Sequence, residues 1–126
     1  MRTTEASQGQ PDDRFKATIV ATILDSKTEK AIEMLSEHYH VDQPKLGVGV
    51  VTGRSKGVLA VYSANRKEIL AVRQEFLYDP FVMLHEFYHH LRQFAGHHRG
   101  TEKNADKFAL DYIAAYKRVA SGSSKT

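Results

Sequence analysis

Residues 85–89 read His-Glu-Phe-Tyr-His, an H-E-x-x-H pattern that lies inside a predicted helix. Two histidines four positions apart lie one above the other on one helical face, so their ring nitrogens can converge on one ion about 2 Å from each. Glu86 lies one step around the helix, where a carboxylate suits the role of a general base toward a metal-bound water. The pattern therefore predicts a zinc centre in which His85 and His89 are metal ligands and Glu86 is the catalytic residue.

A catalytic zinc ion takes three protein ligands and a water, so two histidines leave the predicted site incomplete. The candidates for the third ligand are His97 and His98, which follow the predicted helix, and Glu102, which opens the next one. The metzincin continuation x-x-G-x-x-H is absent, because its two fixed positions hold arginine and alanine. Glu102 has better support, since Asp106 follows one turn later on the same face, where an acid can accept the remaining N–H of a zinc-bound histidine.

The chain has seven histidines and no cysteine among its 126 residues. The absence of cysteine excludes disulfide frameworks, thiolate metal sites and cysteine catalysis. A metal site in this chain must therefore use histidine and carboxylate ligands, and a His/His/Glu set is one that a catalytic zinc ion uses. We expect His38, His40 and His90 to take no part in the site.

Two helices must position these residues. Asp79 followed by Pro80 is typical of a helix start, with Asp as the N-cap and Pro at the first helical position. This helix is expected to run to Phe94 and to stop near Gly96. A last helix is predicted to begin at Thr101, because apolar residues follow at helical spacing: Ala105, Phe108, Ala109, Tyr112, Ile113 and Tyr116.

The N-terminal part predicts one or two further helices. Asp12 or Asp13 can cap the first, whose apolar face is Phe15, Ile19, Val20 and Ile23. Ser26 or Thr28 can cap a continuation whose apolar face is Ala31, Ile32, Leu35 and Tyr39.

Residues 45–73 are rich in glycine and β-branched residues and predict a small sheet. Segments 46–51, 57–63 and 68–72 are read as strands separated by turns at 52–56 and 64–67, which indicates an antiparallel meander. The predicted fold is α+β: an N-terminal helical segment, a three-stranded antiparallel sheet, the active-site helix and a C-terminal helix. Residues 12–119 are expected to form one domain, with a flexible arm at 1–11 and a flexible tail at 120–126.

The H-E-x-x-H pattern followed by Glu-Lys-Asn-Ala-Asp-Lys-Phe-Ala at residues 102–109 resembles the gluzincin metallopeptidases. The most similar members are the ImmA/IrrE-like domain and the archaeal minigluzincins, whose third-ligand segment reads E-x-x-A-D/N-x-F-A. The resemblance covers roughly residues 45–116. It implies a minimal zincin-like fold with one Zn²⁺ per chain, His85, His89 and Glu102 as its ligands, Glu86 as the base and Asp106 as the support of a ligand. It also implies that strand 68–72 is the edge strand along which an extended peptide substrate pairs.

The chain departs from this family at Tyr88, a bulky residue where a small one is usual. Gluzincins also use a His, Tyr or Arg to stabilise the oxyanion, and His97, His98, Tyr112 and Tyr116 are the candidates for that role.

Composition bounds the remaining possibilities. The 18 basic and 15 acidic residues give a net charge of +3, too small to indicate nucleic-acid binding. No apolar run is long enough to span a membrane and no secretory signal is present, so a cytoplasmic location is expected. The sequence thus predicts a zinc metalloendopeptidase, a hydrolase of peptide or protein substrates, held latent by a terminal segment in the cleft. The alternative is a zinc-binding regulatory or protein-interaction domain without peptidase activity.

Overall fold

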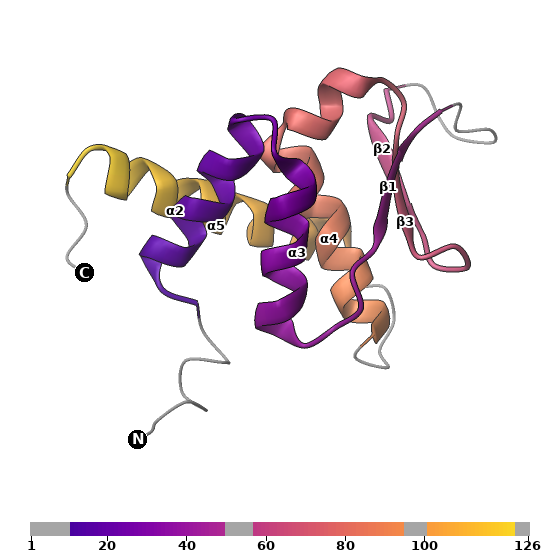
Figure 1. The fold of residues 1–126 in the computed structure, drawn as a ribbon, viewed down its shortest axis with the longest axis horizontal. Coiled ribbons are helices and arrows are strands. Elements are labelled where there is room, and N and C mark those ends of the chain that lie inside the picture. The colour runs from indigo at the N-terminus through magenta and orange to yellow at the C-terminus, as the bar shows by residue number, and fades with distance from the viewer. Residues whose placement is uncertain (1–10, 50–56, 95–100, 123–126) are drawn as a thin grey trace.

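The computed structural model describes residues 11–49, 57–94 and 101–122. These residues form four α-helices, one 3-10 helix and a three-stranded sheet (Figure 1), which confirms the predicted α+β class. The predicted N-terminal arm, apart from Pro11, and residues 123–126 of the predicted tail lie outside the described ranges. Among the described helices, none combines the length and the apolar character needed to span a membrane.

Helix α2 (Asp13–Leu24) begins where the sequence predicts. The carboxylate of Asp12 accepts a hydrogen bond of 2.9 Å from the backbone N–H of Phe15, which satisfies one of the free donors at the helix start. The apolar spacing turns one face of the helix into the core, where four side chains are buried: Ala17, Ile19, Val20 and Ile23.

Helix α3 (Thr28–Tyr39) is a separate helix rather than a continuation. The break occurs because Ser26 has a φ of 65°, in the left-handed region that a continuing α-helix excludes. The predicted cap at Ser26 or Thr28 is wrong, since Lys27 is the N-cap residue and makes no side-chain cap bond. The hydroxyl of Thr28 instead donates to the backbone carbonyl of Leu77, a contact from another part of the chain.

The sheet contains β1 (Lys45–Val48), β2 (Ala60–Ser63) and β3 (Glu68–Ala71) in the order β1-β3-β2. Strands β2 and β3 form the expected antiparallel hairpin, but β1 pairs with β3 in parallel. The predicted antiparallel meander is therefore wrong, and the sheet is mixed. The short turn at residues 64–67 holds β2 and β3 together as neighbours, whereas the longer connection from 49 to 59 leaves β1 free to pair on the other side of β3.

This order makes β3 the central strand. The prediction that residues 68–72 form an edge strand is wrong, because β1 and β2 occupy both sides of β3. Ile69 and Ala71 on this strand are both fully buried. The edge strands of the described sheet are β1 and β2, so any added strand must pair with one of them.

The predicted start of the motif helix is confirmed. After a 3-10 helix, η1 (Gln74–Tyr78), which was not predicted, α4 (Pro80–Phe94) begins directly behind Asp79. The Asp79 carboxylate accepts hydrogen bonds from the backbone N–H groups of Phe81 at 2.9 Å and Val82 at 3.3 Å. Proline at the first helical position needs no N–H partner, so capping is complete with these bonds.

The last helix, α5 (Glu102–Ala120), is capped by Thr101, whose hydroxyl accepts from the backbone N–H of Asn104 at 3.0 Å. Its predicted start is therefore confirmed. Ala120, which the sequence assigns to the predicted tail, is the last residue of the helix. The predicted stop of α4 near Gly96 falls outside the described residues.

Helix α4 lies between the sheet and the other helices (Figure 1). It packs against α5 on one side and against β2 on another. Four apolar residues of α4 are buried in the core, Val82, Met83, Leu84 and Phe87, and the small residues Ala105 and Ala109 are fully buried on α5. The motif residues on α4 are thereby fixed between the start of α5 and the edge strand β2.

Candidate metal centre

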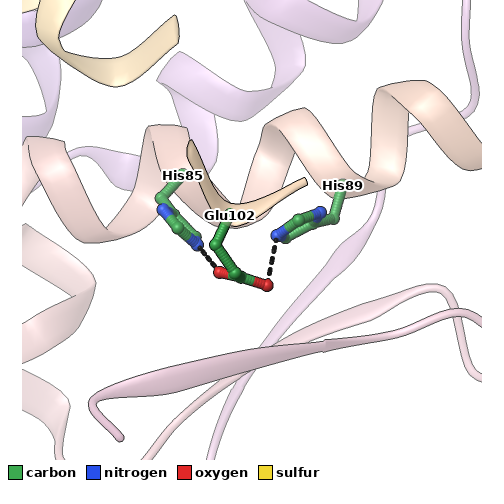
Figure 2. A group of neighbouring side chains, drawn as sticks. All are labelled: His85, His89 and Glu102. Carbon is green, nitrogen blue, oxygen red and sulfur yellow. Dashed lines mark hydrogen bonds and ion pairs between the residues drawn. The ribbon is translucent and has the colours of Figure 1, made fainter. Parts of the chain in front are cut away.

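His85 and His89 lie one turn apart on α4, and their rings project from the same side of the helix (Figure 2). The centroids of the two rings are 5.1 Å apart. The His89 side chain is 1% exposed and that of His85 is 14% exposed. The helical spacing thus presents two largely buried imidazoles to one location.

Glu102 completes the group from the first turn of α5. Its Oε1 lies 2.7 Å from Nε2 of His85 and its Oε2 lies 3.3 Å from Nε2 of His89, so the carboxylate spans the two rings (Figure 2). The three candidate ligand atoms all lie within 4.8 Å of one another. The structure therefore brings together the three residues that the sequence predicts, and the group can hold a metal ion. The other candidates for the third ligand, His97 and His98, lie outside the described residues.

The donor set and the spacing fit a metal such as zinc. Zinc binds imidazole nitrogen and carboxylate oxygen at about 2.0–2.2 Å, which places tetrahedral ligand atoms about 3.3 Å apart. The separations of 2.7 and 3.3 Å are close to that value, and the Glu102 side chain, 70% exposed, is free to make the small adjustment. Imidazole and carboxylate ligands also suit iron, copper and nickel, so the donor set is compatible with zinc without being exclusive to it.

Asp106 supports His85 from the second turn of α5. Its Oδ1 lies 2.9 Å from Nδ1 of His85. A carboxylate only accepts hydrogen bonds, so this contact places the proton of the neutral ring on Nδ1. With a metal ion bound, the Nε2 lone pair of this neutral ring would face the ion, which is the tautomer that a metal ligand needs. The 2.7 Å contact between Nε2 and the Glu102 carboxylate is a hydrogen bond from a protonated Nε2, which an ion would replace.

The environment of Glu102 favours its charged form. Partial burial acts to raise the pKa of Glu102, but the hydrogen bond from His85 and the charges of His89 and His85 outweigh it, and the net pKa is lowered. An ionised carboxylate is the form that binds a cation.

Glu86 lines a cavity of about 230 Å³ beside the group and is 7% exposed. His85 and Glu102 line the same cavity. Its other walls are apolar and come from the start of β2 and the first turns of α4: Val58, Leu59, Ala60, Phe81 and Val82. The predicted base and two of the predicted ligands thus face one small space.

The two oxyanion candidates among the described residues, Tyr112 and Tyr116, do not line this cavity. Tyr112 lies ten positions after Glu102 on α5, about 15 Å along the helix axis, and its hydroxyl is 2.7 Å from that of Tyr39 in the core. Tyr116 lines a groove between α2 and the end of α5. His97 and His98 fall outside the described ranges.

His90 is the functional candidate that the sequence reasoning missed. It is fully buried, with Nδ1 at 2.7 Å from the Tyr62 hydroxyl and Nε2 at 2.7 Å from the carbonyl of Asp42. The sequence gives no sign that His90 makes these two contacts, because both partners are distant in the sequence. The other two expected bystanders lie elsewhere: His38 stacks on Phe15 and His40 is the C-cap residue of α3.

No protein family, curated protein or solved structure matches the chain.

Proposed function

We propose that the chain is a zinc-dependent metallopeptidase of the gluzincin type, located in the cytoplasm. The observation that carries the proposal is the carboxylate of Glu102 spanning His85 and His89 at 2.7 and 3.3 Å. The resemblance of residues 85–89 and 102–109 to the gluzincin pattern supports it, because the same residues that match the pattern lie together in space.

His85, His89 and Glu102 would hold the ion, and Asp106 would keep the His85 ring in the required tautomer and orientation. A bound zinc ion supplies Lewis-acid chemistry, which polarises a peptide carbonyl and makes a water more acidic. Glu86, at the wall of the same cavity, takes the proton of the attacking water and returns it to the leaving amine.

The corrected strand order changes where a substrate would lie. Residues 58–60 line the cavity at the start of β2, and β2 is an edge strand of the described sheet. An extended peptide adding to the outer edge of β2 would pass directly beside His85 and Glu86, whereas β3 has no free edge. Latency through a terminal segment is part of the proposal, and it concerns residues 1–11 and 120–126, most of which lie outside the described ranges.

The test pairs metal content with cleavage. We expect about one zinc per wild-type chain, and zinc-dependent cleavage of denatured casein once the terminal segments are trimmed. Glu86→Gln should keep the zinc and lose cleavage by a factor of about 10³ or more, because the general base is removed while the ligands remain. Glu33→Gln, at a half-exposed glutamate on α3, is the matched control and should behave like wild type.

A wild-type chain that binds zinc but never cleaves casein or a peptide library, even after its termini are trimmed, would contradict the peptidase proposal and favour a zinc-binding regulatory domain. Cleavage that survives in Glu86→Gln would contradict the assigned base.

A further inference from the structure

His90 is a buried histidine that the proposed metal chemistry does not use. Its Nε2 lies 2.7 Å from the carbonyl oxygen of Asp42, which can only accept, so Nε2 carries the proton. In the neutral ring Nε2 then holds the single proton. In that ring Nδ1 is an acceptor, and the Tyr62 hydroxyl at 2.7 Å donates to it. Both nitrogens are therefore satisfied by partners from different parts of the fold.

The hydrogen bond from Tyr62 to His90 joins strand β2 to helix α4, two of the elements that line the cavity. Tyr62 is on β2, two residues beyond Ala60 in the cavity wall, and is 5% exposed. His90 is on α4, one turn beyond Glu86 on the opposite wall. The two rings also pack edge to face with centroids 5.2 Å apart. This contact ties the edge strand to the motif helix beside the cavity.

The metal ligands do not depend on this contact. His85 and His89 come from α4 and Glu102 comes from α5, and these two helices pack on each other directly. Strand β2 contributes no ligand to the group, but it contributes the cavity wall and the outer edge where a peptide can pair. A loosened β2 would change the cavity and leave the ligands in place.

We propose that Tyr62 and His90 are positioning residues, whose hydrogen bond holds β2 at the distance from α4 at which an extended peptide reaches the metal centre. This inference rests on the proposed function for its peptide partner. The bond fixes the separation of the two cavity walls, while the link from His90 to Asp42 anchors the same helix to the segment between α3 and β1.

The test uses two substitutions that each remove one buried hydroxyl. Tyr62→Phe removes the bond to His90, and Tyr39→Phe removes the hydroxyl that lies 2.7 Å from Tyr112 in the core, away from the cavity. Both are made in zinc-loaded Glu86→Gln, so that peptides are bound without being cleaved. The probe is a fluorescein-labelled octapeptide selected from a positional-scanning library, with its dissociation constant measured by fluorescence anisotropy.

We expect Tyr62→Phe to raise the dissociation constant about 10-fold, since a wall displaced by a fraction of an ångström misplaces the peptide. It should also speed amide hydrogen exchange in residues 58–63 while zinc stays at one per chain. Tyr39→Phe should lower the melting temperature about as much as Tyr62→Phe does. It should change neither the peptide affinity nor the amide exchange of residues 58–63. His90→Gln retains one donor and one acceptor and should keep more affinity than His90→Leu, which retains neither.

Equal effects of Tyr62→Phe and Tyr39→Phe on exchange and affinity would overturn the inference, because the bond would then be an ordinary core contact. If no peptide binds the parent even after its termini are trimmed, the peptidase proposal fails, and exchange in residues 58–63 alone decides the positioning role. Unchanged amide exchange of residues 58–63 in Tyr62→Phe would then reject the positioning role, and faster exchange would support it.

Discussion

The carboxylate of Glu102 lies 2.7 Å from Nε2 of His85, although the two residues belong to different helices and are 17 positions apart. The contact depends on where α5 begins. Thr101 caps the helix, so Glu102 is its first residue and lies at the end that favours a negative charge. The capping residue therefore sets the direction from which the acid approaches the two histidines.

The first prediction concerns this acid. Glu102→Gln should reduce zinc from about one per chain to a small fraction, because a neutral amide is a much weaker ligand than a carboxylate. Glu29→Gln is the matched control, since Glu29 is also an exposed glutamate in the first turn of a helix, on α3. Metal analysis of both purified variants measures the effect. Full zinc in Glu102→Gln would show that the third ligand is another residue, with His97 and His98 tested next.

The second prediction concerns the support of His85. Asp106→Ala should weaken zinc binding by about 10- to 100-fold, since the His85 ring loses the partner that fixes its tautomer and orientation. Asp106→Asn should lose less, because its side-chain oxygen still accepts from Nδ1. Asp111→Ala removes an exposed acid from the same helix and should not change the affinity. Competition with a chromophoric chelator gives the dissociation constants, and equal affinities for all three variants would exclude the role assigned to Asp106.

Local rules in the sequence were sufficient for the parts of the fold that carry the ligands. A cap and a helical period depend on residues within about one turn, so Asp79 and Thr101 were recognised from their neighbours alone. The same short range explains why the face shared by His85 and His89 was predictable, since residues i and i+4 of a helix lie on the same face, one above the other. Placing Glu102 beside them required in addition the resemblance to a family.

Features that depend on distant partners were not predictable. The parallel pairing of β1 with β3 is set by packing across the sheet, and nothing within residues 45–48 distinguishes it from an antiparallel pairing. Thr28 looks like a helix cap in sequence but donates to Leu77, 49 positions away. His90 likewise obtains its partners from positions 62 and 42, so its burial emerges only when the strand and the helix meet.

The third prediction concerns the cavity beside the centre. Five of its lining residues are apolar and its charged residues are acidic, so peptides with leucine or phenylalanine at the residue next to the cleaved bond should be preferred over those with aspartate. Phe81→Ala enlarges the cavity and should reduce the preference for leucine over alanine at this substrate position. The expected change in the ratio of the two kcat/KM values corresponds to about 1 to 2 kcal/mol. Val61→Ala, on β2 but not at the cavity, is the control. An unchanged preference in Phe81→Ala would place the substrate side chain elsewhere.

The fourth prediction concerns stability at alkaline pH. Burial raises the pKa of Tyr39 and of Tyr112, whose hydroxyls lie 2.7 Å apart, and the charge of Asp111 raises both further. In the unfolded chain a tyrosine titrates near pH 10, so above that pH the unfolded state loses protons that the folded state retains. Stability should therefore be unaffected by these groups below about pH 9 and fall above pH 10, by about 1.4 kcal/mol per pH unit for each tyrosine that stays protonated.

Urea unfolding at pH 8, 10 and 11 measures this decline. The double variant Tyr39→Phe, Tyr112→Phe should be less steeply destabilised between pH 10 and 11 than wild type, because its two phenylalanines do not titrate. Some decline should remain in the variant, since burial also raises the pKa of Tyr62. Parallel curves for the two proteins would mean that the Tyr39–Tyr112 pair opens to water before the fold does.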